Sequence, residues 1–161
     1  MKRALFAAAV LLAASGARAE LPTKQVLTHQ VAKNIVTAAA AEARKRNATV
    51  VIAVVDDGGH LIVLERLDDT QVASVEVGIG KARTAAIFRR PSKVFEDQVK
   101  NGRVAALALP GATPLQGGLP IIHGGRVLGA IGVSGNTPQE DEAIARAGLD
   151  AAPAAIEASG G

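Results

Sequence analysis

Three histidines are the side chains of this sequence best suited to hold a soft metal ion. The chain has no cysteine, and its one methionine is Met1. Imidazole is therefore the soft ligand that remains, with hydroxyl and carboxylate oxygens as weaker options. The histidines are His29, His60 and His123. The absence of cysteine excludes a disulfide, a thiolate nucleophile, a zinc–thiolate site and an iron–sulfur cluster.

His29 is the preferred metal ligand because of its predicted place in a helix. It follows Thr28, a plausible N-cap, in the first turn of a helix predicted over residues 28–46. The positive end of the helix dipole favours the neutral imidazole, which is the form that binds a metal. The alternative is a solvent-exposed polar residue next to the cap. His60 and His123 adjoin glycine pairs at predicted hairpin turns, where exposure is the default.

A second group of candidate binding residues lies on a helix predicted over residues 71–88. The helix is indicated by an apolar stripe at 3-4 spacing, made of Val72, Val75, Ile79, Ala82 and Ala86. Lys81, Thr84 and Phe88 lie about a quarter turn from this stripe, with Arg83 close by. A cation, a hydroxyl and an aromatic ring on one line could receive a planar anionic ligand. The alternative is a solvated face whose aromatic residue closes the core at the helix end.

Two glycine-containing segments could bind an anion through backbone amides. Residues 110–118 form a loop rich in proline and glycine that contains Thr113 and Gln116, and residues 135–137 precede the last predicted helix. Thr113 is also a candidate oxygen ligand for iron. The alternative is that both segments only turn the chain and cap the helix. The acidic run at residues 140–142 is interpreted as compensation of the helix dipole rather than as an acid–base pair.

The elements predicted to position these residues alternate hairpins with helices. Their order is a helix at 28–46, a hairpin at 50–67, a helix at 71–88, a short helix at 91–100, a strand at 104–109, a hairpin at 120–133 and a helix at 138–151. Single strands do not alternate with helices in this order. The pattern therefore favours an α+β fold with an antiparallel sheet over a doubly wound parallel one.

Two of the predicted strands carry no charge, at residues 50–55 and 127–133. An antiparallel sheet with one wet face alternates apolar and polar residues along each strand. Both faces of this sheet should therefore be covered, either by helices of the same chain or in part by a second copy. On this ground we expect a homo-oligomer.

The first nineteen residues have the features of an export signal. Lys2 and Arg3 precede an uncharged apolar stretch at residues 4–14, and Ala17-Arg18-Ala19 matches the small-x-small cleavage pattern. The stretch is about half of the roughly 20 apolar residues needed to span a bilayer. We therefore expect a signal peptide at 1–19, a single mature domain at 20–161, and a periplasmic or secreted protein without a membrane anchor.

Cleavage would leave a neutral chain that is poor in aromatic residues. It removes Lys2, Arg3 and Arg18, which account for the whole formal charge of +3. A nucleic-acid partner normally requires a basic patch, so we set that class aside. The aromatic residues that remain are Phe88 and Phe95.

Four segments in order resemble the GlcG/HbpS family, which includes the C-terminal domain of PduO-type proteins. They are VVDDGGHL from Val54, KARTA from Lys81, GGLPI from Gly117 and GAIGVSGNTPQEDE from Gly129. The resemblance spans residues 27–152. It implies a profilin-like fold with a five-stranded antiparallel sheet between helices. It also implies haem or tetrapyrrole binding in some members, oligomers up to octamers, and secretion in the branch that senses or sequesters haem.

Two hypotheses for function follow from the residues and the resemblance. The first is a secreted, non-enzymatic protein that sequesters, stores or presents haem as a homo-oligomer. The residues assigned to haem are His29 as iron ligand, with Lys81, Arg83, Thr84, Phe88 and Thr113 around it. With so few aromatic residues, the haem is expected at the surface or between subunits.

The alternative is an enzyme or accessory protein that holds a small organic acid. Its binding site would be the loop at 110–118 together with the helix start at Gly135 to Thr137. No serine has the context of a nucleophile elbow, which argues against a hydrolase. A purely structural oligomer is the third possibility.

Overall fold

A computed structural model describes residues 21–159 of the 161-residue chain. The signal peptide predicted at 1–19 lies outside the described residues. The elements in chain order are α1 (His29–Lys45), β1 (Val51–Asp56), β2 (Leu61–Arg66), α2 (Ser74–Ile87), α3 (Lys93–Lys100), the 3-10 helix η1 (Val104–Ala108), β3 (Gly118–His123), β4 (Arg126–Ser134), α4 (Pro138–Asp150) and α5 (Ala152–Ser159).

The described residues form one antiparallel sheet with the strand order β2-β1-β4-β3. The α+β class and the antiparallel sheet are confirmed, but the prediction of five strands is wrong, because the sheet has four. The strand predicted at 104–109 is the helix η1. Its amides bond to carbonyls nearby in the chain, such as Ala106 N–H to Arg103 O, and not to a neighbouring strand. The profilin-like relationship stays a prediction.

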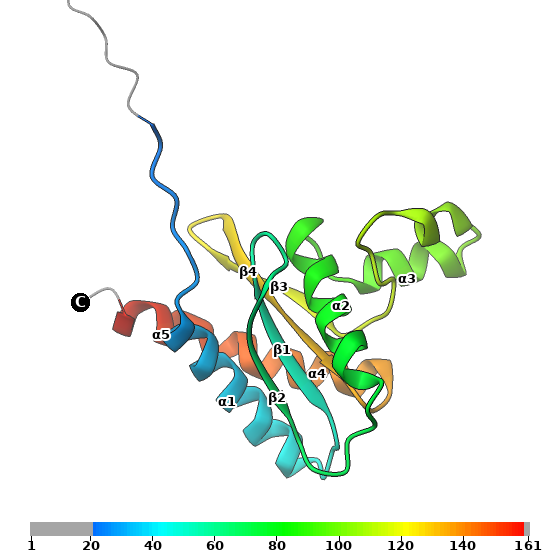
Figure 1. Ribbon diagram of the computed structural model, residues 1–161, viewed down its shortest axis with the longest axis horizontal. Helices are drawn as coiled ribbons and strands as arrows, with labels where there is room; N and C mark the ends of the chain where they lie inside the picture. Colours follow the sequence, from blue (N-terminus) through cyan, green and yellow to red (C-terminus); the bar gives the residue numbers. More distant parts are fainter. Residues whose placement is uncertain (1–20, 160–161) are drawn as a thin grey trace, which may run out of the picture.

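Helices cover both faces of the sheet (Figure 1). α1 and α4 pack on one face, where the large aliphatic core lies, and α5 packs against these two helices. α2 crosses the other face over β1, β3 and β4. The core under α2 is small and consists of Val55, Ala82, Ala85, Ala86 and Ala130. Helices of the same chain therefore bury the uncharged segments 50–55 and 127–133 of the sheet, which need no second copy for this. The homo-oligomer stays a prediction.

α2 approaches the sheet closely because small residues face it. A Cβ atom placed on Gly132 of β4 would lie 2.2 Å from the Gly78 carbonyl oxygen and 2.5 Å from the Ala82 nitrogen. Glycine at 132 therefore sets the distance between helix and sheet. The predicted apolar stripe is only partly buried, since Val72 is 72% exposed. The buried residues of α2 are Ser74, Gly78, Lys81, Ala82, Thr84, Ala85 and Ala86.

The two predicted helix caps are confirmed. The Thr28 hydroxyl accepts a hydrogen bond from Val31 N–H at the start of α1. At the start of α4, Thr137 and Glu140 form a capping box. Hydrogen bonds from Thr137 hold the pKa of the Glu140 carboxyl below its usual value. Within residues 21–159, no helix is long and apolar enough to cross a membrane.

Candidate functional site

His29 is the first residue of α1, and its side chain is exposed to solvent. α1 covers the sheet face opposite to α2 (Figure 1). His29 therefore lies across the sheet from Lys81 and Thr84, the buried candidate residues of α2.

The other two histidines adjoin the hairpin turns. β1 and β4 are antiparallel, and Asp56 pairs with Gly129, so both turns lie at the same end of the sheet. His60 is exposed, with its Nδ1 atom 3.4 Å from a carboxylate oxygen of Asp56. His123 is half-buried at the end of β3. No group of three or more His, Cys, Asp or Glu side chains in the described part of the chain could hold a bare metal ion.

Lys81 is buried, so it lies neither on an open ligand-binding face of α2 nor on the solvated face considered as the alternative. Its Nζ atom is 2.7 Å from Oδ2 of Asp141 and donates to the Val133 carbonyl at 3.0 Å. The two charged side chains are only 5% and 2% exposed. The other oxygen of Asp141 accepts a hydrogen bond from Asn136 N–H at 3.0 Å. Lys81 is therefore engaged inside the protein and cannot meet a ligand carboxylate at the surface.

Burial raises the pKa of the Asp141 carboxyl above its usual value, although Lys81 and the amides of residues 135 and 136 act in the opposite direction. Sequence reasoning missed this residue by assigning the whole acidic run to the helix dipole. A signal was present, because Asp141 shares the 3-4 spacing of the buried residues Ile144, Ala145 and Gly148. A charge within a buried helix face requires a partner of opposite sign.

Thr84 and Thr113 are brought together, but by a contact between helix and loop. Thr84 is buried, which corrects its predicted place on an exposed face. Its hydroxyl donates to the Gly80 carbonyl at 2.8 Å and accepts from Thr113 N–H at 2.7 Å. Thr84 therefore fastens the loop at 110–118 to α2.

The same loop is held at two further points. The Ser92 hydroxyl donates to the Leu115 carbonyl at 2.6 Å and accepts from Gly118 N–H at 2.9 Å. Gln116 N–H donates to a Glu96 carboxylate oxygen at 2.5 Å. The loop amides of residues 113, 116 and 118 are thus occupied by the chain's own side chains.

The helix start at 135–137 is occupied in the same way. Asn136 N–H donates to Asp141, and Thr137 N–H donates to Glu140 at 3.3 Å. The alternative hypothesis of a small organic acid held by these amides would therefore require displacing the chain's own carboxylates.

Arg83 and Phe88 lie toward the end of α2. The exposed Arg83 donates from Nε to the Gly59 carbonyl at 3.2 Å and so links α2 to the turn between β1 and β2. Phe88 is half-buried, and its ring centroid is 4.9 Å from that of Phe95. The ring of Phe88 therefore packs against α3.

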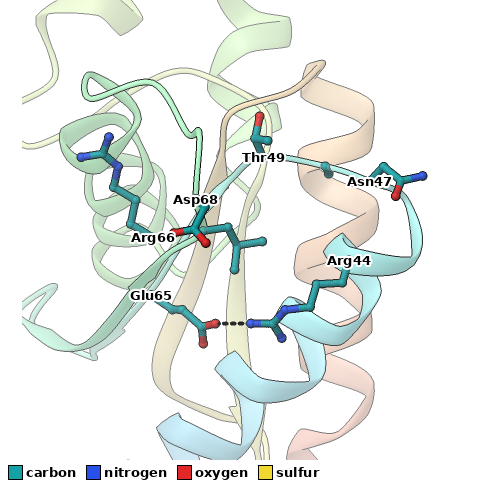
Figure 2. A pocket seen from close by; sticks show the side chains of 8 residues that line it. Arg44, Asn47, Thr49, Glu65, Arg66 and Asp68 are labelled. Carbon is teal, nitrogen blue, oxygen red and sulfur yellow. Dashed lines mark hydrogen bonds and ion pairs between the residues drawn. The ribbon is translucent and has the colours of Figure 1, made fainter.

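One surface pocket, of about 530 Å³, lies where α1 ends, between residues 44–49 and 65–68. Figure 2 shows Arg44 reaching toward Glu65, and their ion pair measures 2.8 Å. Arg66 donates to the Thr70 carbonyl at 2.7 Å. Acidic and basic groups balance in this pocket, since it also contains Asp68.

A second pocket, of about 480 Å³, lies at the end of the sheet where the two hairpin turns meet. We call it the cationic pocket. Its lining includes Lys24, Asp57, Arg89, Ile122, Arg126 and Leu128. Sequence reasoning missed it because its residues come from four separate segments, none of which forms a motif.

The fold and these residues define a class of protein. It is a small α+β protein with an antiparallel sheet between helical layers and an exposed histidine at a helix N-terminus. A family model described as "Haem degrading protein HbpS-like" matches residues 27–150. The chain belongs to this HbpS-like family.

Two relatives by sequence cover most of the chain. Protein GlcG of Escherichia coli (strain K12) is 46% identical over 114 residues, which cover 71% of this chain and 85% of that protein. An uncharacterized 15.0 kDa protein from the dhaT-dhaS intergenic region of Citrobacter freundii is 37% identical over 128 residues, covering 77% of this chain and 90% of that one.

Solved structures agree with this family. A double mutant of Streptomyces reticuli HbpS has a TM-score of 0.76 at 32% identity, covering 89% of this chain and 97% of that one. PduOC, solved as a complex with haem, has a TM-score of 0.72 at 24% identity, covering 79% of this chain and 95% of that one. The latter likeness concerns the fold.

Proposed function

We propose that this protein binds haem, with His29 as the protein ligand to iron. The proposal rests on the solvent exposure of the His29 side chain at the start of α1. Haem iron is commonly held by a single axial histidine, because the porphyrin supplies the other nitrogen ligands. An isolated histidine is thus sufficient for haem, whereas a bare metal ion requires several side chains. The family description and the haem complex of PduOC support haem as the molecule that is bound.

The proposal includes export to the periplasm or the medium and a role in sequestering, storing or presenting haem. The sequence of the first nineteen residues supports export. The test is to measure the mass of the protein recovered from the periplasmic fraction, which should equal that of a chain beginning at Glu20. Because the family is described as haem degrading, breakdown of the bound haem is a second outcome to test for. A Soret band that decays after binding, in the presence of a reductant and oxygen, would indicate degradation.

Replacing His29 with alanine tests the iron ligand. Mature wild-type protein titrated with haemin is expected to give a saturable shift of the Soret band, and His29→Ala to bind at least about tenfold more weakly, because an iron–imidazole bond is lost. His60→Ala is the matched control, since His60 is also exposed but lies at a hairpin turn. Thr113→Ala tests the oxygen ligand in the same titration.

The outcomes separate the parts of this proposal. No saturable shift in the wild type would reject haem binding. A normal titration of His29→Ala, with a loss in His60→Ala, would move the iron ligand to the other histidine.

We further propose that the protein forms a homo-oligomer through the arm made by α3 and η1. The arm projects beyond the sheet (Figure 1), and η1 exposes two large apolar side chains, Val104 at 65% and Leu107 at 61%. Residues three apart lie on the same side of a 3-10 helix, so the two form one apolar surface.

Leu107→Glu is expected to lower the mass of the assembly, because a charge would have to be buried at the contact. Light scattering after gel filtration measures this mass. Ala105→Glu is the matched control, because Ala105 is exposed on the same short helix. A wild-type protein that is monomeric at all concentrations would contradict the proposal.

A further inference from the structure

We infer that the cationic pocket binds an organic dicarboxylate. Resting on the proposed function, we assign the two carboxylates to the propionate groups of haem. Sequence reasoning gave the role of binding a propionate to Lys81, which is buried. We give this role instead to Arg89 and Arg126, which line the pocket.

Charge is the first argument for a dicarboxylate. The pocket contains three cations and one carboxylate, and that carboxylate, Asp57, pairs with Lys24 at 2.7 Å. Within residues 21–159, no carboxylate oxygen lies within 4.0 Å of the guanidinium nitrogens of Arg89 or Arg126. Arg126 also donates from Nη1 to the Thr23 carbonyl at 3.5 Å, but this neutral acceptor leaves its charge uncompensated. The charges of Arg89 and Arg126 are therefore left to act on a ligand. The planar guanidinium group suits a carboxylate because it donates two parallel hydrogen bonds.

The backbone at Arg89 is the second argument. Arg89 follows Phe88, the C-cap of α2, and has a φ of +55°. This left-handed position after a helix is usually glycine or asparagine, because a longer side chain is strained there. Strained residues persist only where the surrounding structure holds them, and they cluster at binding and active sites. The strained backbone places Arg89 in the lining of the cationic pocket.

The wall beside the two arginines is apolar, which is the third argument. Ile122 is 58% exposed, and Val127 and Leu128 lie next to it in the lining. An exposed isoleucine beside two cations matches a ligand that joins carboxylates to an apolar body. The volume, about 480 Å³, is within the range of small-molecule sites.

The position of the pocket relative to His29 is the fourth argument. Gln25 lines the pocket and precedes His29 by four residues. Consecutive Cα atoms are 3.8 Å apart, so the two Cα atoms lie within about 15 Å of each other. Leu27, between them, packs near Gly129 of β4 at the same end of the sheet. One porphyrin could therefore have its iron at His29 and its propionates in the cationic pocket.

A comparison of two ligands on two proteins tests this inference. Haemin and haemin dimethyl ester, whose propionates are uncharged, are titrated into wild type and into Arg89→Gln/Arg126→Gln. We expect haemin to bind the double variant at least tenfold more weakly, which is about 1.4 kcal/mol, and the ester to bind both proteins equally. Lys45→Gln/Arg146→Gln is the matched control, because it removes two exposed cations outside the pocket.

A free dicarboxylate without a porphyrin would present the same two carboxylate groups to the pocket. Succinate is therefore titrated by calorimetry in the absence of haemin. Binding to wild type but not to the double variant, without any Soret shift by haemin, would support the pocket and reject haem binding. Haemin binding that is equal in wild type and in the double variant would reject the pocket and leave the proposed function standing. No binding of either probe would reject both.

Arg89→Gly distinguishes a loss of binding caused by the missing side chain from a loss caused by misfolding. Glycine adopts a positive φ without strain, so this variant is expected to unfold at the same temperature as wild type or higher. It should nevertheless bind haemin more weakly. Unchanged binding in a folded Arg89→Gly would overturn the role of Arg89.

Discussion

Lys81→Met is expected to lower the free energy of unfolding by about 3–5 kcal/mol, because it leaves the Asp141 carboxylate buried without its partner. Both side chains are almost completely enclosed, and the ion pair measures 2.7 Å. Small domains are stable by only about 5–15 kcal/mol in total, so this loss is a large fraction. Urea unfolding of the variant and of wild type, followed by circular dichroism, measures the difference.

The double variant Lys81→Met/Asp141→Leu is the control for this prediction. Apolar side chains of similar size remove the buried charge together with its partner, so most of the lost stability should return. A double variant that is as unstable as Lys81→Met would contradict this account. It would indicate that the contact of Lys81 with the Val133 carbonyl, and not the charge, is what matters.

The pH dependence of the same pair has a defined sign. The pKa of Asp141 is raised in the folded protein by burial. A carboxyl group of this kind binds its proton more readily in the folded state. Its contribution to stability is therefore greatest below the unfolded pKa and is lost as the pH rises through the folded pKa. Wild type should gain stability relative to the double variant as the pH falls from neutral toward about 4.

Gly132→Ala is expected to lower the free energy of unfolding by about 3 kcal/mol, at the upper end of typical overpacking. The new methyl group would lie 2.2 Å from the Gly78 carbonyl oxygen and 2.5 Å from the Ala82 nitrogen. Both atoms belong to the backbone of α2, so the whole helix would have to move away from the sheet. Urea unfolding again provides the measurement.

Gly78→Ala is the matched control on the other side of this contact. Its methyl group would meet a side-chain atom of Val51 at 3.2 Å, and a side chain can shift by the small distance required. Alanine also favours a helix over glycine by about 1 kcal/mol. We therefore expect Gly78→Ala to be nearly neutral. Equal losses in the two variants would show that backbone contact does not set the distance between α2 and the sheet.

Local sequence signals predicted most of the fold. The two hairpins were predictable because their turns contain paired glycines, and α4 was predictable because Thr137, Pro138 and Glu140 form a start signal within a few residues. The segment at 104–109 was assigned wrongly for a physical reason. Six apolar residues without charge suit a strand as well as a helix, and the choice depends on whether a neighbouring strand is available.

The candidate site was less predictable, because its contacts join distant segments. Lys81 and Asp141 are sixty residues apart in sequence. The helix pattern placed Lys81 on an outer face because Val72, Val75 and Ile79 were taken as the core stripe. The sheet instead selects small residues, which rotates the buried face of α2 toward Lys81 and Ala85. The cationic pocket likewise forms only where the two hairpins, the end of α2 and the segment before α1 meet.

The strand order has a consequence for how the chain folds. The centre of the sheet pairs β1 with β4, in which residue 56 lies opposite residue 129, and α1 packs against α4 near the other end of the sequence. Closing such long loops is slow, because entropy is lost before the distant contacts form. The first half of the chain cannot complete its core alone. During synthesis, which starts at the N-terminus, the chain therefore remains incompletely folded, with exposed apolar strands, until β4 and α4 have also left the ribosome.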